Sequence, residues 1–128
     1  GANIFIGLSK PGLLTKDMVK SMDDKPIIFA LANPTPEIMP DEAMAAGAYI
    51  VATGRSDYPN QANNSLVFPG LFRGVLEANI PQFKIEMFGA VAQTIADAVV
   101  DLGPQKILPG MFEDRIVTLV TETVKKLA

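Results

Sequence analysis

The sequence contains no cysteine, no histidine and no tryptophan among its 128 residues. Without cysteine there can be no disulfide, no thiolate nucleophile and no cysteine-bound zinc, and without histidine there is no serine–histidine triad or imidazole metal ligand. Any chemistry must therefore use carboxylates, lysine, tyrosine, amides or a cofactor. The lack of cysteine agrees with a reducing compartment, and we expect a cytoplasmic protein.

Basic residues are too few and too scattered for a nucleic-acid interface. Eleven Lys and Arg residues stand against fourteen Asp and Glu residues, a formal charge of −3, and no segment gathers the cations on one face. No apolar run approaches the ~20 residues needed to cross a bilayer. The N-terminus also lacks the features of a signal peptide. We therefore expect neither a nucleic-acid partner nor a membrane partner.

Three short apolar runs organise the first half of the chain, at residues 4–8, 27–32 and 48–52. Each is followed by a stretch rich in Gly, Pro or Asn, and the first two are then followed by a helical pattern, which is typical of alternating strands and helices. The runs are nearly continuous in apolar residues, which predicts parallel strands covered on both faces. The fold class is α/β, the second half of a doubly wound, Rossmann-like parallel sheet of about three strands.

The helices expected between these strands are short. Thr15 is the expected N-cap of the first. The second is expected over residues 41–46 and ends at a glycine. Asp41 and Glu42, with Glu37 nearby, are interpreted as acids of a first helical turn and not as a catalytic pair.

The second half of the chain has helical spacing and no further strand. Apolar residues recur at this spacing in three segments, near residues 71–76, 85–99 and 116–127. We therefore divide the chain into strand–loop–helix units at residues 1–64 and C-terminal helices at residues 65–128.

The first predicted strand, Ile4–Leu8, has no obvious neighbour on one side. An apolar edge strand left bare is an aggregation hazard. We therefore expect it to pair with a part of the protein that precedes this sequence, or with another copy of the chain.

Ligands of open parallel sheets bind at the carboxyl ends of the strands, where three polar loops are expected here. One contains Asn33, which Pro34 should hold in an extended conformation, and the longest ends in Asn63 and Asn64. Amide side chains can orient a carboxylate or a carboxamide without adding charge. The alternatives are a turn-forming role for Asn33 and a helix N-cap role for Asn63 and Asn64.

The longest loop also contains Arg55 and Asp57. A local ion pair between their side chains is at least as reasonable as contact with a ligand, and on an exposed loop it would contribute only ~0 to 1 kcal/mol. There is no G-x-G-x-x-G motif, so the turn that usually identifies a dinucleotide site is absent. Without any resemblance to a known family, the residues indicate only half of a ligand-binding crevice in an α/β domain.

Three strings of the sequence carry a specific resemblance: FALANPTPEIMPDEA, ATGRSDYPNQANNSLVFPGLFRG and ILPGMFEDR. With them the whole chain, residues 1–128, closely resembles the C-terminal part of the NAD(P)-binding domain of short bacterial-type malic enzymes. The resemblance implies oxidative decarboxylation of malate to pyruvate and carbon dioxide, with reduction of NAD or NADP. It also implies a dependence on Mg²⁺ or Mn²⁺.

The resemblance assigns binding roles to this segment and places the catalytic groups elsewhere. Malate would be held by the amides of Asn33, Asn63 and Asn64. The cofactor would be contacted by Gly7, Leu8, Ser9, Asn33 and Asn64, with the first three acting mainly through their backbone. The lysine base, the tyrosine acid and the acidic metal ligands of the family would all lie upstream, so no catalytic residue and no metal ligand is assigned here.

The sequence is compatible with several alternatives. One is a fragment that is inactive alone, and another is a non-catalytic nucleotide-binding module or subunit. Within the same family, the complete protein could instead decarboxylate oxaloacetate. The choice between NAD and NADP depends on a strand that this sequence does not contain. A homo-oligomer is expected.

Overall fold

The computed structural model describes the whole chain, residues 1–128. The chain divides into two compact units. The first consists of residues 1–62 together with 103–106, and the second of residues 63–102 together with 107–128. None of the helices is both long enough and apolar enough to span a membrane.

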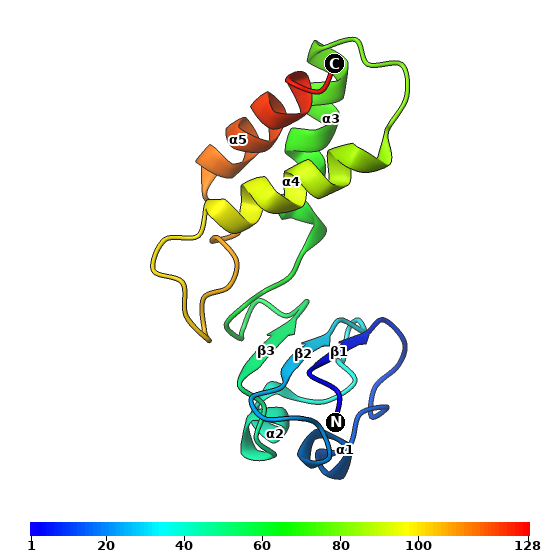
Figure 1. Ribbon diagram of the computed structural model, residues 1–128, viewed down its shortest axis with the longest axis vertical. Coiled ribbons are helices and arrows are strands. Elements are labelled where there is room, and N and C mark those ends of the chain that lie inside the picture. The colour runs from blue at the N-terminus through cyan, green and yellow to red at the C-terminus, as the bar shows by residue number, and fades with distance from the viewer. The chain divides into compact units, whose positions relative to one another are not determined.

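The first unit is built on a parallel sheet of three strands (Figure 1). They are β1 (Ile4–Gly7), β2 (Ile27–Ala30) and β3 (Ile50–Thr53), in the order β1-β2-β3. All three overlap the predicted apolar runs, and both pairings are parallel. The predicted α/β class and the edge position of the first strand are confirmed.

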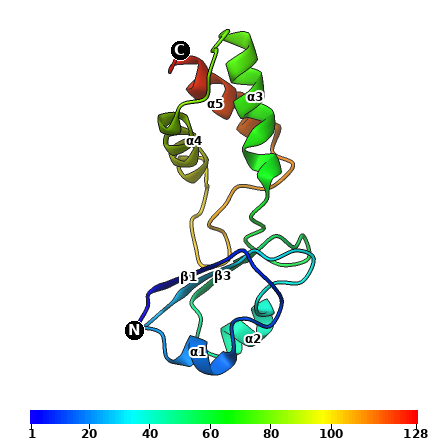
Figure 2. The same ribbon diagram turned by 90° about the vertical axis from the view of Figure 1, so that its right-hand side faces the viewer.

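Helices α1 (Lys16–Lys20) and α2 (Pro40–Ala45) lie on the same face of this sheet (Figure 2). Thr15 caps α1 as predicted, because its Oγ1 accepts a hydrogen bond from the backbone N–H of Met18 at 3.2 Å. Val19 of α1 and Ala43 of α2 are buried in one apolar cluster with inward-facing strand residues. The sheet and these two helices therefore share one core.

The opposite face of the sheet differs from the sequence-based expectation. The runs predicted strands covered on both faces, but α1 and α2 cover only one. On the other face the side chains of Ile4 and Ile6 are 53% and 65% exposed. A continuous run of apolar residues indicates that both faces of a strand are buried. It does not indicate which part of the protein packs against each face.

The second unit contains a short 3₁₀ helix, η1 (Asn64–Leu66), and the three predicted helices. These are α3 (Phe68–Glu77), α4 (Ile85–Asp97) and α5 (Asp114–Lys125). Their buried faces form one cluster, to which α3 contributes Leu71, α4 contributes Val91 and α5 contributes Val120. The prediction that strands give way to helices is confirmed.

Side-chain hydrogen bonds to backbone carbonyls support the packing of these helices. The Thr121 hydroxyl donates across to the carbonyl of Gly70 at 3.2 Å, or back to Val117 at 2.7 Å. Arg115 donates from Nη2 to the carbonyl of Ala98 at the end of α4, at 2.8 Å. This last bond satisfies a terminal carbonyl that has no partner within the helix.

Candidate functional site

The carboxyl ends of the three strands lie side by side in the first unit. The register pairs Gly7 of β1 with Ala30 of β2, and Ala30 with Thr53 of β3. The loops that follow the strands therefore leave from the same edge of the sheet, as the sequence predicts. Leu31 donates its backbone N–H to the carbonyl of Gly7 at 2.9 Å, so the first two loops begin in contact.

Glu37 joins the first two loops through its carboxylate. Oε1 accepts the backbone N–H of Ser9 at 2.8 Å, and Oε2 accepts that of Ala32 at 3.1 Å. The side chain is completely buried. The interpretation of Glu37 as a first-turn acid is therefore wrong: α2 begins three residues later, at Pro40, and its first turn carries Asp41 and Glu42 only.

The environment of Glu37 favours the ionised form. Burial alone would raise the pKa of this carboxyl, but the backbone N–H donors of Ser9 and Ala32, with its own backbone N–H, outweigh burial and hold the pKa below its usual value. A carboxylate is thus kept charged inside the fold by hydrogen bonds from backbone amides. Glu37 takes part in no ion pair.

Gly7 makes the room that the Glu37 carboxylate occupies. A Cβ atom at Gly7 would lie 2.5 Å from Glu37 Cδ and 2.6 Å from Oε1. Gly7 is buried, while the neighbouring Leu8 is 77% exposed. Of the first-loop residues predicted to contact a cofactor, Gly7 is therefore covered by Glu37, and Leu8 presents its side chain at the surface.

Ser9 is exposed, and its backbone N–H is bonded to Glu37. Its carbonyl and its hydroxyl are the groups that remain for a ligand, so the predicted backbone contact would use the carbonyl.

Asn33 lies in the second loop of this edge, between β2 and α2. The residue is exposed, its peptide bond to Pro34 is cis, and no hydrogen bond holds its side chain within the chain. A turn-forming asparagine would bond its own backbone two residues on, and no such bond is present. Asn33 therefore presents a free amide beside Ala32, which Glu37 fixes.

The loop after β3 begins with a local ion pair. Arg55 binds Asp57 through two bonds, from Nε to Oδ1 at 2.8 Å and from Nη2 to Oδ2 at 2.6 Å. Its guanidinium also lies 5.6 Å from the centre of the Tyr58 ring. The hydrogen bond to Arg55 lowers the pKa of the Asp57 carboxyl, while burial and the nearby Asp41 raise the pKa of Tyr58. Arg55 and Asp57 thus bind each other and shape the loop.

The end of this loop returns to the sheet. Asn60 donates from Nδ2 to the carbonyls of Val51, at 3.1 Å, and Pro104, at 2.8 Å. Ala62 then donates its backbone N–H to the carbonyl of Thr53 at 2.8 Å. The long loop is therefore ordered and closes on the carboxyl end of β3.

Asn63 and Asn64 come next and open the second unit. The Oδ1 atom of Asn63 accepts the backbone N–H of Ser65 at 3.1 Å, which caps η1. The N-cap alternative is thus realised at Asn63. Asn64 is exposed and, like Asn33, has no hydrogen bond from its side chain within the chain.

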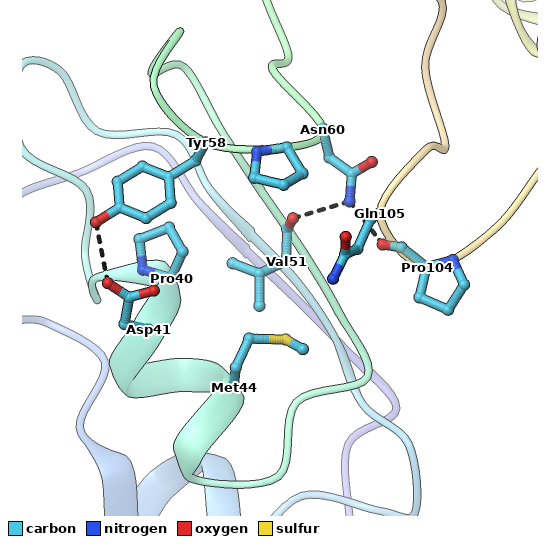
Figure 3. Close-up of a pocket in the computed structure, with 9 residues that line it drawn as sticks. Pro40, Asp41, Met44, Val51, Tyr58, Asn60, Pro104 and Gln105 are labelled. Carbon is cyan, nitrogen blue, oxygen red and sulfur yellow. Dashed lines mark hydrogen bonds between the residues drawn. The ribbon is translucent and has the colours of Figure 1, made fainter.

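The first unit also has a pocket of about 130 Å³ between α2 and the long loop (Figure 3). Tyr58 points toward Asp41 across it, and the two are joined by a hydrogen bond of 3.3 Å. Its other lining residues are Pro40, Met44, Val51, Pro59, Asn60, Pro104 and Gln105. No residue predicted to bind malate or the cofactor lines this pocket.

No group of three or more His, Cys, Asp or Glu side chains is arranged to hold a metal ion. The residues present therefore do not fit a divalent-metal site.

The architecture defines part of a doubly wound, Rossmann-like α/β domain with loops gathered at its carboxyl edge. The chain belongs to the NAD-binding domain family of malic enzymes, because the family model described as "Malic enzyme, NAD binding domain" matches residues 1–128. The sequence-based resemblance is confirmed.

Relatives and solved structures agree. The "Bifunctional malic/malolactic enzyme" of Bacillus subtilis (strain 168) is 49% identical, over 99% of this chain and 32% of that protein. The "NADP-dependent malic enzyme" of Rhizobium meliloti (strain 1021) is 43% identical, over 100% and 19%. The crystal structure of an NAD-dependent malic enzyme from Thermotoga maritima has a TM-score of 0.93 at 44% identity, over 98% and 33%. The chain thus spans about a third or less of these proteins.

Proposed function

We propose that this chain is the part of an NAD(P)-dependent malic enzyme that orients malate against the nicotinamide. The complete protein would oxidise malate and release pyruvate and carbon dioxide. Family membership supports this assignment. The observation that carries the local role is the pair of exposed amides at Asn33 and Asn64, neither of which is used within the chain.

The proposed malate contacts follow from the donors and acceptors of each amide that are not bonded within the chain. Asn33 and Asn64 each keep two N–H donors and a carbonyl acceptor, which suits a carboxylate and a hydroxyl. Asn63 has its oxygen engaged with Ser65 but keeps its NH₂ group. Asn63 and Asn64 directly follow Ala62, which is bonded to the end of β3.

The proposed cofactor contacts fit the shape of a nicotinamide ring. Such a ring has apolar faces and one carboxamide, and the first two loops offer the exposed Leu8 side chain, the Ser9 hydroxyl and the Asn33 amide. When bound, NAD or NADP would accept a hydride from malate. Gly7 would contribute indirectly, because its missing side chain leaves the space that the Glu37 carboxylate occupies.

The proposed role of this chain is to position malate and the nicotinamide ring relative to each other. Amide donors fix the carboxylate and hydroxyl of malate, and the loop residues fix the ring that receives the hydride. Correct placement of two reactants can supply several kcal/mol of a barrier reduction. The groups that move protons belong to other parts of the complete protein.

The experiment is amide removal in the complete enzyme. Asn33→Ala and Asn64→Ala should each lower kcat/KM for malate about 10- to 100-fold, because each removes a hydrogen bond to a charged substrate. Cofactor reduction measured by absorbance gives the rates. Asn3→Ala is the matched control, because Asn3 is an exposed amide bonded only to Asp23. A loss below threefold in both variants, with the control unchanged, would contradict the proposal.

A malolactic activity of the complete protein is a second candidate. It is favoured by the name of the Bacillus subtilis relative, which joins malic and malolactic. Product analysis separates the two, because one reaction leaves pyruvate with reduced cofactor and the other leaves lactate.

We also propose that the β1 edge is covered in the complete protein, by another part of the polypeptide or by a second copy in a homo-oligomer. The strand order supports this, because β1 pairs with β2 on one side and has no strand neighbour on the other. A cytoplasmic location is the setting expected for an enzyme that uses NAD or NADP.

A further inference from the structure

We propose that Glu37 is the positioning residue of the site: its carboxylate holds the Leu8 and Asn33 loops at a fixed separation, so that cofactor and malate are oriented together. This inference rests on the function proposed above. It concerns a buried residue that touches neither ligand in that proposal and acts only through the two loops.

The connectivity of Glu37 favours this role. Each carboxylate oxygen binds a different loop, Oε1 the N–H of Ser9 and Oε2 the N–H of Ala32. Ser9 directly follows Leu8, and Ala32 directly precedes Asn33. A planar group of three atoms therefore sets the distance between the loops that present these two side chains. A third bond, from the N–H of Leu14 to the Glu37 carbonyl at 3.3 Å, fixes the backbone that carries the carboxylate.

The chemistry of Glu37 is costly for a purely structural link. Acidic side chains are rarely fully buried unless they are paired, and burying a charge without strong hydrogen bonds is strongly unfavourable. The fold nevertheless keeps Glu37 completely buried and gives up a side chain at Gly7 to make room for it. The result is a single rigid acceptor, the Glu37 carboxylate, that binds backbone N–H donors from two loops.

A neutral amide cannot reproduce this arrangement. Glutamine has one oxygen and one NH₂ group at its end, so Glu37→Gln would place a donor against the N–H of either Ser9 or Ala32. Aspartate keeps both oxygens but is one methylene shorter, so Glu37→Asp would reach at most one loop at full strength. Both variants should loosen the loops without removing a group that touches a ligand.

The test measures, in the complete enzyme, whether a Glu37 variant changes KM or only the amount of active enzyme. Glu37→Gln should raise the KM for malate and for the cofactor together, each about tenfold, as expected for one lost charge-assisted bond. A residue that only stabilises the fold would instead lower the amount of active enzyme and leave both KM values unchanged, which would overturn the proposal. Glu42→Gln is the matched control, because Glu42 is an exposed acid of the same segment, paired with Lys16.

Two further variants make the result decisive. If Glu37→Gln does not fold, Glu37→Asp takes its place, with the same joint rise in KM expected. In the double variant with Asn33→Ala, the malate effects should be clearly less than multiplicative, because both act through the same loop. Fully multiplicative effects would overturn the proposal. If Asn33→Ala alone changes nothing, it is the proposed function that fails, whereas a normal KM in Glu37→Gln beside an impaired Asn33→Ala rejects only the role of Glu37.

Discussion

Replacing Gly74 with alanine should destabilise the helical unit by about 3 kcal/mol, at the upper end of what overpacking costs. A Cβ atom at Gly74 would lie 2.7 Å from the Cβ of Val124 and 2.8 Å from the carbonyl oxygen of Thr121. Both atoms belong to the rigid backbone region of α5, so neither can move aside as the end of a flexible side chain would. Gly70, four residues earlier, meets Val120 in the same way at 2.7 Å.

The matched control has the opposite expected sign. Gly89 lies inside α4, and a Cβ atom there would meet nothing within 4 Å. Because alanine is the better helix former, Gly89→Ala should stabilise the unit by about 1 kcal/mol. Denaturant unfolding followed by far-UV circular dichroism measures both changes. Equal stability of Gly74→Ala and the wild type would show that α3 and α5 do not pack as closely as described.

The second large effect is expected for Gly7→Ala, which should destabilise the sheet unit by about 3 kcal/mol. The new methyl group would occupy the position of the Glu37 carboxylate, 2.5 Å from Cδ. Moving Glu37 away would break its bonds to Ser9 and Ala32, and hydrogen bonds to a charged group contribute about 1.5–3 kcal/mol each.

Tyrosine fluorescence can report this effect from the sheet unit alone. Both tyrosines, Tyr49 and Tyr58, lie in residues 1–62, and the sequence has no tryptophan. Gly54→Ala is the control at the same edge of the sheet, because its Cβ would lie 3.9 Å from its nearest neighbour, the Ala62 carbonyl. If both variants unfold at the wild-type denaturant concentration, Glu37 is not held in place by the absence of a side chain at Gly7.

The fold followed from the sequence wherever the signal was local. Three apolar runs indicate the strands, Thr15 indicates a helix cap, and helical spacing locates α3, α4 and α5. Each of these signals is contained within about a dozen consecutive residues. The strand faces were less predictable, because the covering of Ile4 and Ile6 depends on what lies beside the sheet and not on the strand itself.

The residues that organise the candidate site were missed because their partners are distant in the sequence. Glu37 binds Ser9, which lies 28 positions away, and Asn60 binds Pro104, which lies 44 positions away. The close approach at Gly70 and Gly74 involves residues of α5 about fifty positions further on. One signal for Glu37 was present, since a lone acid stood among apolar and proline residues before the helix it was assigned to.

The most direct test is the structure of the complete enzyme with its cofactor and oxalate, an unreactive dicarboxylate that resembles the reacting end of malate. If Asn33 and Asn64 hold the substrate, their side-chain amides should lie within hydrogen-bond distance, about 3 Å, of oxalate oxygens, with the nicotinamide against the loop of Leu8. Oxalate bound elsewhere, or both amides turned away from it, would contradict the proposed orienting role of this chain.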